Sequence, residues 1–417
     1  MKKALILFLI FLAIILNGQS KLDFLKENRF DINNPYFEFP QDNFKVIGFG
    51  AIHGSSKTYD AELNLIKGIL KKNTIDFYVS ETNFSQAYYF QKYLETGDEN
   101  LLRELVLEFQ AIVSQEGSIE TFNHWKNLKK LNDETTSNKI KVLGFDVVNE
   151  YKFPIKHIIY LTKNITDWTE RDKLESYLKD DTTNFGLNNE NLEKDLKLFI
   201  ESFNKNQSKY ESNIEDKFSF EFILYNISQN FVEERDREKI IYENYLKLNE
   251  LLNLKEKKIF MKYGYFHIQK AREDNYPSFF TRLIENNIYT EKEIITIMGY
   301  LTKSEVLWDK IYDNTGNYKT FTTKKGYGIG DYWKEYFKGI NKLKKIYVSD
   351  MTLFRLNKEN SPYRFGTDLI KIKMFLKDYN RTKLKGKNTL DFIDYALLIR
   401  NSEAQRPIEE LNEKVNH

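Results

Sequence analysis

Residues 44–55 have the sequence FKVIGFGAIHGS, in which a short apolar run from Phe44 to Gly50 is followed by His53 and Gly54. A run of this length that ends in turn-forming residues is typical of a buried strand. Similar runs occur at residues 75–80, 140–145, 258–263, 293–298 and 345–349. We expect all of these runs to be strands.

Helical patterns separate the predicted strands. Apolar residues at helical spacing precede the run at 75–80 and follow it, at Leu63, Ile66 and Leu70 and then at Ala87, Phe90, Tyr93 and Leu94. Strands that alternate with helices indicate a mainly parallel sheet whose faces are covered by helices. The sequence therefore predicts an α/β fold with a mainly parallel central sheet flanked by helices.

The stretch from about residue 154 to residue 254 contains no convincing strand. Its apolar residues recur at helical intervals, for example at Leu192, Leu196, Phe199 and Phe203. We interpret this stretch as a long helical insertion within a single domain that covers residues 21–417.

Residues 1–20 have the layout of a secretory signal peptide. Lys2 and Lys3 precede an apolar run from Ala4 to Leu16, and Gly18 and Ser20 supply small residues. The run is shorter than the roughly 20 residues of a spanning helix, so retention as a membrane anchor is the alternative. We expect a periplasmic or secreted protein with no stable membrane insertion after signal removal. The chain has no cysteine, which excludes disulfides and thiol chemistry.

The charges nearly cancel, since 63 basic residues face 61 acidic ones, and this balance does not indicate nucleic acid as a partner. Aromatic residues make up 15% of the chain, which can fill a core or line a pocket for a small-molecule substrate. The oligomeric state stays open.

Ionisable residues follow five of the predicted strands. They are His53, Glu81, Asp146, His267 and Asp350. Ligands in open α/β sheets bind outside the carboxyl ends of the strands, so parallel runs would bring these side chains to one rim. We therefore expect a site in which His53, Glu81 and His267 converge.

Each of these residues also has a structural interpretation. A carboxylate after a strand often caps the next helix, which is the alternative role for Asp146. Packing is the expected role of His124 and His157, which lie in helical patterns. His53 and His267 differ because each follows an apolar strand and has a glycine nearby.

The first half of the chain resembles the erythromycin esterase family and the wider Tiki and ChaN-like group. The family's opening strand and His-Gly pair are similar to the segment that ends in His53 and Gly54, although Gly50 or Ala51 takes the place of its glutamate. Further family elements are a strand that ends in glutamate, a Tyr-Leu-x-x-Gly turn and a Gly-x-Asp. They are matched at Glu81, at residues 93–97 and at residues 144–146.

The second half continues the resemblance in the same order. The family's Arg-Asp-x-x-Met-x-x-Asn helix is similar to residues 237–244, where Arg237 and Asn244 are two helical turns apart and share a face. Its His-Asn-x-His element falls on residues 264–267 and keeps the second histidine, His267. Its closing strand is similar to residues 392–399, which are followed by Pro407.

The resemblance implies a hydrolase that cleaves a carboxylic ester or lactone without a serine or cysteine nucleophile. His53 would be the general base that takes a proton from water, and Glu81 would orient His53 or the water. His267 and Arg237 would face the oxygen that becomes negative in the tetrahedral intermediate. Further substrate contacts are expected from Asp146, Asn244 and Ser55.

Two other functions fit the same residues. His53, Glu81 and His267 could instead be ligands of a divalent metal such as zinc or manganese. Because the family's glutamate and first histidine are not matched, fewer ligands are present, and we favour chemistry without a cofactor. The same two differences also fit an exported ligand-binding protein without catalysis.

Overall fold

The computed structural model describes residues 20–111, 113–135, 138–375, 377–380 and 383–415, so the predicted signal peptide lies, apart from Ser20, outside the described residues. Contacts within the chain divide it into two compact units. The first comprises Met1–Lys72, Ile268–Val306 and Lys324–Ala404, and the second comprises Asn73–His267, Leu307–Thr323 and Gln405–His417. The single domain over residues 21–417 stays a prediction.

The first unit contains five strands that pair one after another. Their order is β1 (Arg29–Asp31), β11 (Met351–Arg355), β14 (Tyr395–Arg400), β6 (Ile294–Thr302) and β2 (Val46–Gly50). β14, β6 and β2 run parallel, whereas β11 is antiparallel to both of its neighbours. Every residue of the three parallel strands is buried, which explains why apolar content alone could predict β2 and β6.

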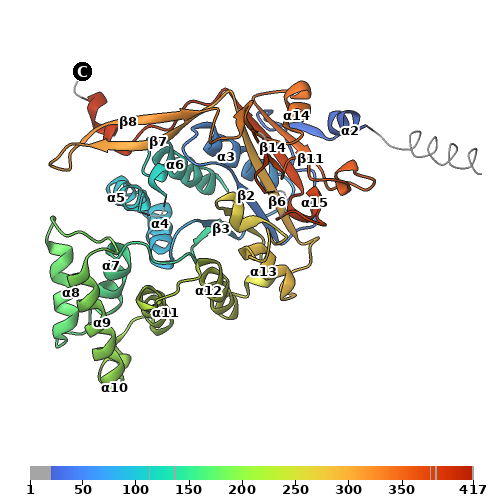
Figure 1. The fold of residues 1–417 in the computed structure, drawn as a ribbon. Coiled ribbons are helices and arrows are strands. Elements are labelled where there is room, and N and C mark those ends of the chain that lie inside the picture. Colours follow the sequence, from blue (N-terminus) through green and yellow to red (C-terminus); the bar gives the residue numbers. More distant parts are fainter. Residues whose placement is uncertain (1–19, 112, 136–137, 376, 381–382, 416–417) are drawn as a thin grey trace, which may run out of the picture. The chain divides into compact units, whose positions relative to one another are not determined.

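The second unit contains three strands in the order β5 (Ile259–Lys262), β3 (Phe77–Ser80) and β4 (Lys141–Leu143), all of them parallel. In both units helices follow the strands along the chain (Figure 1). In the first unit α3 (Lys57–Leu70) follows β2, and in the second unit α4 (Phe84–Thr96), α5 (Glu99–Phe109) and α6 (Ile119–Glu134) follow β3. The predicted α/β fold, with a mostly parallel sheet and flanking helices, is confirmed.

The predicted helical insertion is also confirmed, because no strand occurs between residues 154 and 254, all of which are described. Figure 1 shows this stretch in green as a group of helices. They are α7 (Lys152–Leu161), α8 (Thr169–Lys179), α9 (Glu190–Lys205), α10 (Gln207–Tyr210), α11 (Lys217–Ser228) and α12 (Arg237–Leu252). The apolar residues predicted at helical spacing are the buried face of α9. They pack around Trp168, whose ring stacks on Tyr210 at 4.0 Å.

The strand predicted at residues 345–349 is wrong. This segment is the end of α14 (Ile340–Ile346) and the loop after it, and the next strand, β11, begins at Met351. Asp350 therefore precedes an antiparallel strand instead of following a parallel one, and it pairs with Lys57 at 2.8 Å. The error arose because a short apolar run cannot be assigned to strand or helix by its periodicity alone.

The remaining elements were not predicted. They are the hairpin of β7 (Glu305–Tyr312) and β8 (Tyr318–Lys325), a small antiparallel sheet of β9 (Asp331–Tyr332), β10 (Glu335–Phe337), β12 (Ile372–Met374) and β13 (Lys377–Asp378), and the helices α2 (Lys21–Glu27), α13 (Phe279–Glu285) and α15 (Thr389–Phe392). None of the described helices combines the length and the apolar character needed to cross a bilayer.

Candidate active site

Arg237 of the second unit bridges two carboxylates at the ends of parallel strands. Its Nη2 donates to Glu81 Oε1 at 2.7 Å and to Asp146 Oδ2 at 2.6 Å, and its Nε donates to Asp146 Oδ1 at 2.9 Å. Glu81 follows β3 and Asp146 lies three residues after β4, so the parallel pairing of these strands brings both side chains to one edge. Paired hydrogen bonds of this kind fix the guanidinium in one orientation.

Backbone hydrogen bonds hold Glu81 and Asp146 in place. Gly264 N donates to Glu81 Oε2 at 3.0 Å, and Asp146 N donates to Thr82 O at 3.1 Å. Gly144 makes this approach possible, because a Cβ atom there would lie only 2.6 Å from Thr82 O. The glycine of the predicted Gly-x-Asp pattern at residues 144–146 is therefore needed because a side chain would clash with Thr82.

His267 joins the cluster through two further carboxylate contacts. Its Nδ1 is hydrogen-bonded to Glu238 Oε1, and its Nε2 lies 3.5 Å from Glu81 Oε1. The side chains of His267 and Glu238 are only 10% and 3% exposed. Burial lowers the pKa of His267, but the hydrogen bond and charge of Glu238 and the charge of Glu81 outweigh burial and raise that pKa. His267 therefore stays protonated to a higher pH than a free histidine.

Two hydrogen-bond donors of Arg237 make no hydrogen bond within the described part of the chain. Burial lowers the pKa of Arg237, but Asp146 and Glu81 raise it by more, so the guanidinium stays charged. Its hydrogen bonds within the described part of the chain use only Nε and Nη2. The two N–H groups on Nη1 are thus available to a ligand, and 33% of the side chain is exposed.

Tyr263, just beyond β5, adds a buried hydroxyl to the same region. Its ring packs edge-on against His267, with 5.5 Å between the ring centroids, and the side chain is fully buried. Burial and the charges of Asp146 and Glu81 raise the pKa of Tyr263, so the phenol is neutral. Its Oη has no hydrogen-bond partner among the described residues.

The first turn of α12 presents Arg237 and Glu238 to this cluster. Asp236 caps the helix by accepting a hydrogen bond from Lys239 N at 3.0 Å, which fixes where the helix begins. Asn244, two turns further on, is fully buried, and its Nδ2 donates to Phe145 O at 3.0 Å. In this structure Asn244 supports the turn that carries Asp146, and its predicted contact with substrate stays a prediction.

The structure thus brings together four predicted residues, Glu81, Asp146, Arg237 and His267. Asn244, a fifth, supports the turn that carries Asp146, and the remaining two, His53 and Ser55, belong to the first unit. His53 is half-buried in the loop after β2, and Ser55 is buried, with its Oγ 2.7 Å from Ser402 Oγ. The roles of His53 and Ser55 stay predictions.

Sequence reasoning missed Glu238 and Tyr263. A signal for Glu238 was present, because it stands where the family's helix motif has its aspartate, directly after Arg237. Tyr263 gave no signal, since a tyrosine at the end of an apolar run is usually a core residue.

The cluster in its present form does not fit a metal ion. Both oxygens of Glu81 accept hydrogen bonds, and the guanidinium of Arg237 already supplies the positive charge between Glu81 and Asp146. In the described part of the chain, no group of three or more His, Asp or Glu side chains has a geometry that could hold a metal.

The fold as a whole is similar to three solved structures. A Bacillus cereus protein matches with a TM-score of 0.61 and 14% identity, covering 93% of this chain and 98% of its own. A succinoglycan biosynthesis protein matches with a TM-score of 0.62 and 15% identity, covering 94% of this chain and 100% of its own. A mutant of the erythromycin esterase EreC in its open conformation matches with a TM-score of 0.54 and 12% identity, covering 88% of this chain and 93% of its own.

At these identities the likeness shows a distant relationship in fold. No family model matches the sequence, and no curated protein matches it either. The resemblance to the erythromycin esterases is therefore confirmed for the fold, whereas membership of that family or of the Tiki and ChaN-like group stays a prediction.

Proposed function

We propose that this protein is a hydrolase that cleaves a carboxylic ester or lactone at the cluster of Glu81, Asp146, Arg237, Glu238 and His267. The observation that carries the proposal is the buried Glu238–His267 pair, whose second ring nitrogen, Nε2, lies 3.5 Å from Glu81 Oε1. A carboxylate on Nδ1 fixes the ring and stabilises its protonated form, so that Nε2 can transfer a proton. The likeness in fold to an erythromycin esterase supports this reaction class.

In the proposed reaction, water adds to the acyl carbon of the ester. One water proton goes to a base, the remaining hydroxyl bonds to the carbon, and negative charge develops on the carbonyl oxygen. Arg237, through Nη1, and the protonated His267, through Nε2, stabilise that charge in a partly dry site. The bond from carbon to the alcohol oxygen then breaks, and His267 gives its proton to the leaving oxygen.

The base in this proposal is His53, which rests on the family resemblance and on its place after β2. Glu81 orients His53 or the attacking water. We also propose that the chain is exported by the signal peptide at residues 1–20 and that the reaction needs no metal.

The test is hydrolysis of chromogenic esters and lactones by the chain from Ser20 onward, with and without a strong chelator. We expect activity that survives the chelator. The variant His267→Gln should lower kcat by about 10³-fold, because it removes the proton donor but keeps a side chain of similar size. His53→Ala should lower kcat by a similar factor without weakening substrate binding.

His157→Gln is the matched control, because His157 is also a buried histidine of the second unit, but its Nδ1 lies 3.3 Å from Ser85 Oγ and burial lowers its pKa. It should keep the wild-type kcat. Activity that needs added zinc or manganese would instead make His53, Glu81 and His267 ligands, and full activity in His53→Ala would remove the base assignment.

A non-catalytic ligand-binding protein is the second candidate. It is favoured by the internal hydrogen bonds of Glu81, both of whose oxygens are already used. This candidate predicts no turnover with any ester, and ligand affinity that falls when Arg237 is replaced by Met.

A further inference from the structure

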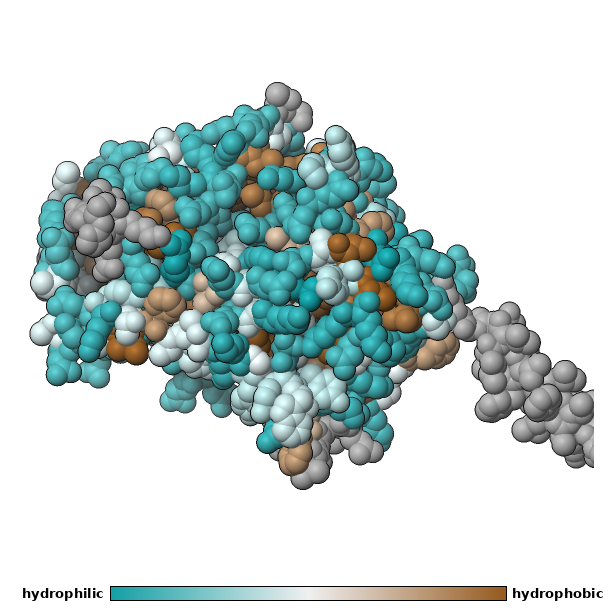
Figure 2. All heavy atoms as spheres, turned by 90° about the horizontal axis from the view of Figure 1, so that it is seen from above, coloured by the Kyte–Doolittle hydropathy of each residue, from teal (hydrophilic) through white to brown (hydrophobic). Residues whose placement is uncertain are grey.

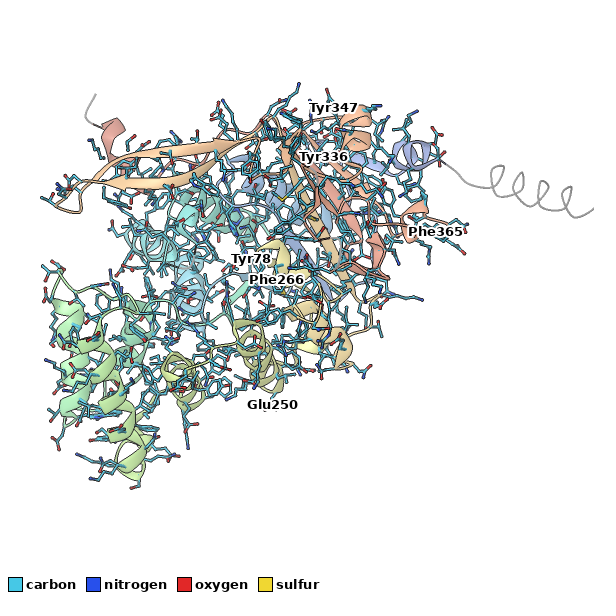
Figure 3. All side chains as sticks on the ribbon, in the orientation of Figure 1. Tyr78, Glu250, Phe266, Tyr336, Tyr347 and Phe365 are labelled. Carbon is cyan, nitrogen blue, oxygen red and sulfur yellow. The ribbon has the colours of Figure 1, made fainter. Side chains whose placement is uncertain are left out.

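A continuous group of exposed aromatic rings lies on and beside the small antiparallel sheet of the first unit. Tyr327, Tyr332, Trp333 and Phe375 are 51%, 38%, 65% and 56% exposed. Neighbouring ring centroids in this series are 6.3, 5.8 and 5.8 Å apart. We call these four residues the aromatic patch; Figure 3 labels Tyr336 on β10 of the same sheet.

Single exposed aromatic residues are common on soluble proteins, whereas contiguous ones mark interaction sites. Figure 2 shows that the face it presents is mostly hydrophilic, with apolar side chains in small separate groups. A connected series of four rings departs from that pattern.

Lysine ammonium groups accompany the rings. Lys334 Nζ lies 4.6 Å from the ring centroid of Trp333 and 5.2 Å from that of Phe375, and Lys324 Nζ lies 5.8 Å from that of Tyr327. Two acidic residues of the sheet also have contacts: Asp331 pairs with Lys344, and Glu335 accepts a hydrogen bond from Gly328 N. Two ammonium groups, those of Lys324 and Lys334, therefore lie beside rings of the aromatic patch, although the whole chain has a net charge of only +2.

We propose that the aromatic patch docks this protein onto an anionic lipid surface. Tryptophan and tyrosine concentrate at the boundary between lipid and water, where a ring is buried and a polar edge stays wet. Lysines at the same level meet the phosphates of anionic lipids. The patch supplies both components, and such docking is peripheral and needs no spanning helix.

The ring geometry favours lipid over a polysaccharide. Sugars stack on ring faces, so a sugar platform needs exposed faces in one plane. Here Tyr327 and Tyr332 are inclined by 89°, and Trp333 and Phe375 by 84°. In addition, Lys334 lies over the Trp333 ring. Rings inclined to one another in this way can enter a headgroup layer but offer no continuous stacking surface.

The experiment is sedimentation of the chain from Ser20 onward with vesicles of phosphatidylcholine, alone or mixed with phosphatidylglycerol. We expect binding to the mixed vesicles that weakens with salt, together with a blue shift of tryptophan fluorescence. The double variant W333A/F375A should weaken binding by at least about tenfold, because two rings no longer enter the interface. Lys334→Glu should also weaken it by about tenfold through charge reversal.

Tyr36→Ala is the matched control, because Tyr36 is 87% exposed and has Lys71 over its ring at 5.9 Å, but it is not part of the patch. It should bind as the wild type does. Equal binding by W333A/F375A and the wild type, no binding to anionic vesicles, or retention on an insoluble polysaccharide in place of vesicles would each overturn the proposal. None of these outcomes depends on ester hydrolysis.

Discussion

His157 and His267 are both buried in the second unit, yet their pKa values are shifted in opposite directions. The His157 ring stacks on Tyr88 with 4.0 Å between centroids, and its Nδ1 lies 3.3 Å from Ser85 Oγ. Burial lowers the pKa of His157 to about 3. The pKa of His267 is raised, because a buried carboxylate is hydrogen-bonded to its ring.

Because both side chains are buried, the difference between their pKa values comes from the neighbouring charge, which offsets burial at His267 but not at His157. A histidine held neutral among aromatic rings contributes to packing. A histidine with a carboxylate on one nitrogen can store a proton and release it from the other. Variants of these residues test whether the carboxylate beside His267 explains the different behaviour of the two histidines.

Removing the charge of Glu238 should make His267 behave more like His157. In Glu238→Gln the pKa of His267 falls, because the remaining hydrogen bond no longer offsets burial. The alkaline limb of kcat/KM should shift to lower pH, and kcat at pH 8 should fall by about 10²-fold. The measurement is a pH profile of ester hydrolysis.

Glu243→Gln is the control for that profile, since Glu243 lies on the same helix but accepts a hydrogen bond from Tyr225 Oη at 2.9 Å. Its profile should match that of the wild type. An unchanged profile in Glu238→Gln would mean that His267 does not carry the proton that limits the reaction.

Stability should depend on pH in opposite ways at the two histidines. The folded pKa of His157 is below the unfolded value of about 6.5, so its contribution is present above pH 6.5 and is lost as pH falls towards 3. Between pH 7 and pH 5 this loss amounts to about 2 kcal/mol. The pKa of His267 is raised, so its contribution is present below about pH 6.5 and is lost as pH rises through the folded pKa.

Urea unfolding of His157→Gln and His267→Gln across this pH range measures both effects. From pH 7 to pH 5, the free energy of unfolding of His157→Gln should fall by about 2 kcal/mol less than that of the wild type. Above pH 6.5, His267→Gln should lose less stability than the wild type. Parallel curves for all three proteins would show that neither pKa is shifted in the folded state.

The sequence allowed Glu81 and Asp146 to be predicted because both follow buried parallel strands, which apolar content reveals. His267 was predicted for a similar reason, although it lies in the short helical turn Tyr265–Ile268, five residues beyond the end of β5. Glu238 was missed because the helix was judged by the face shared by Arg237 and Asn244. The residue next to Arg237 is rotated by about 100° around the helix axis, so it does not share that face.

The antiparallel elements escaped prediction for a different reason. β8 has the sequence YKTFTTKK, and its residues are exposed or half-buried, so its apolar pattern is too weak to detect. The three strand pairs of the small sheet formed by residues 331–378 join segments far apart in sequence or strands of two or three residues, for which local periodicity carries no information.

The smallest expected effect concerns the hydroxyl of Tyr263. Its removal tests whether Tyr263 contributes to function or only to packing. Tyr363 is its matched counterpart, because that side chain is also fully buried and its Oη also has no hydrogen-bond partner among the described residues. Removing either hydroxyl by substitution with Phe should raise the free energy of unfolding by about 1 kcal/mol, since a buried donor without a partner is costly. Only Tyr263 lies beside His267, so only Tyr263→Phe should lower kcat/KM, by about two- to tenfold, because it changes the polarity next to the His267 ring. If both variants gained stability and both kept the wild-type kcat/KM, Tyr263 would be a packing residue.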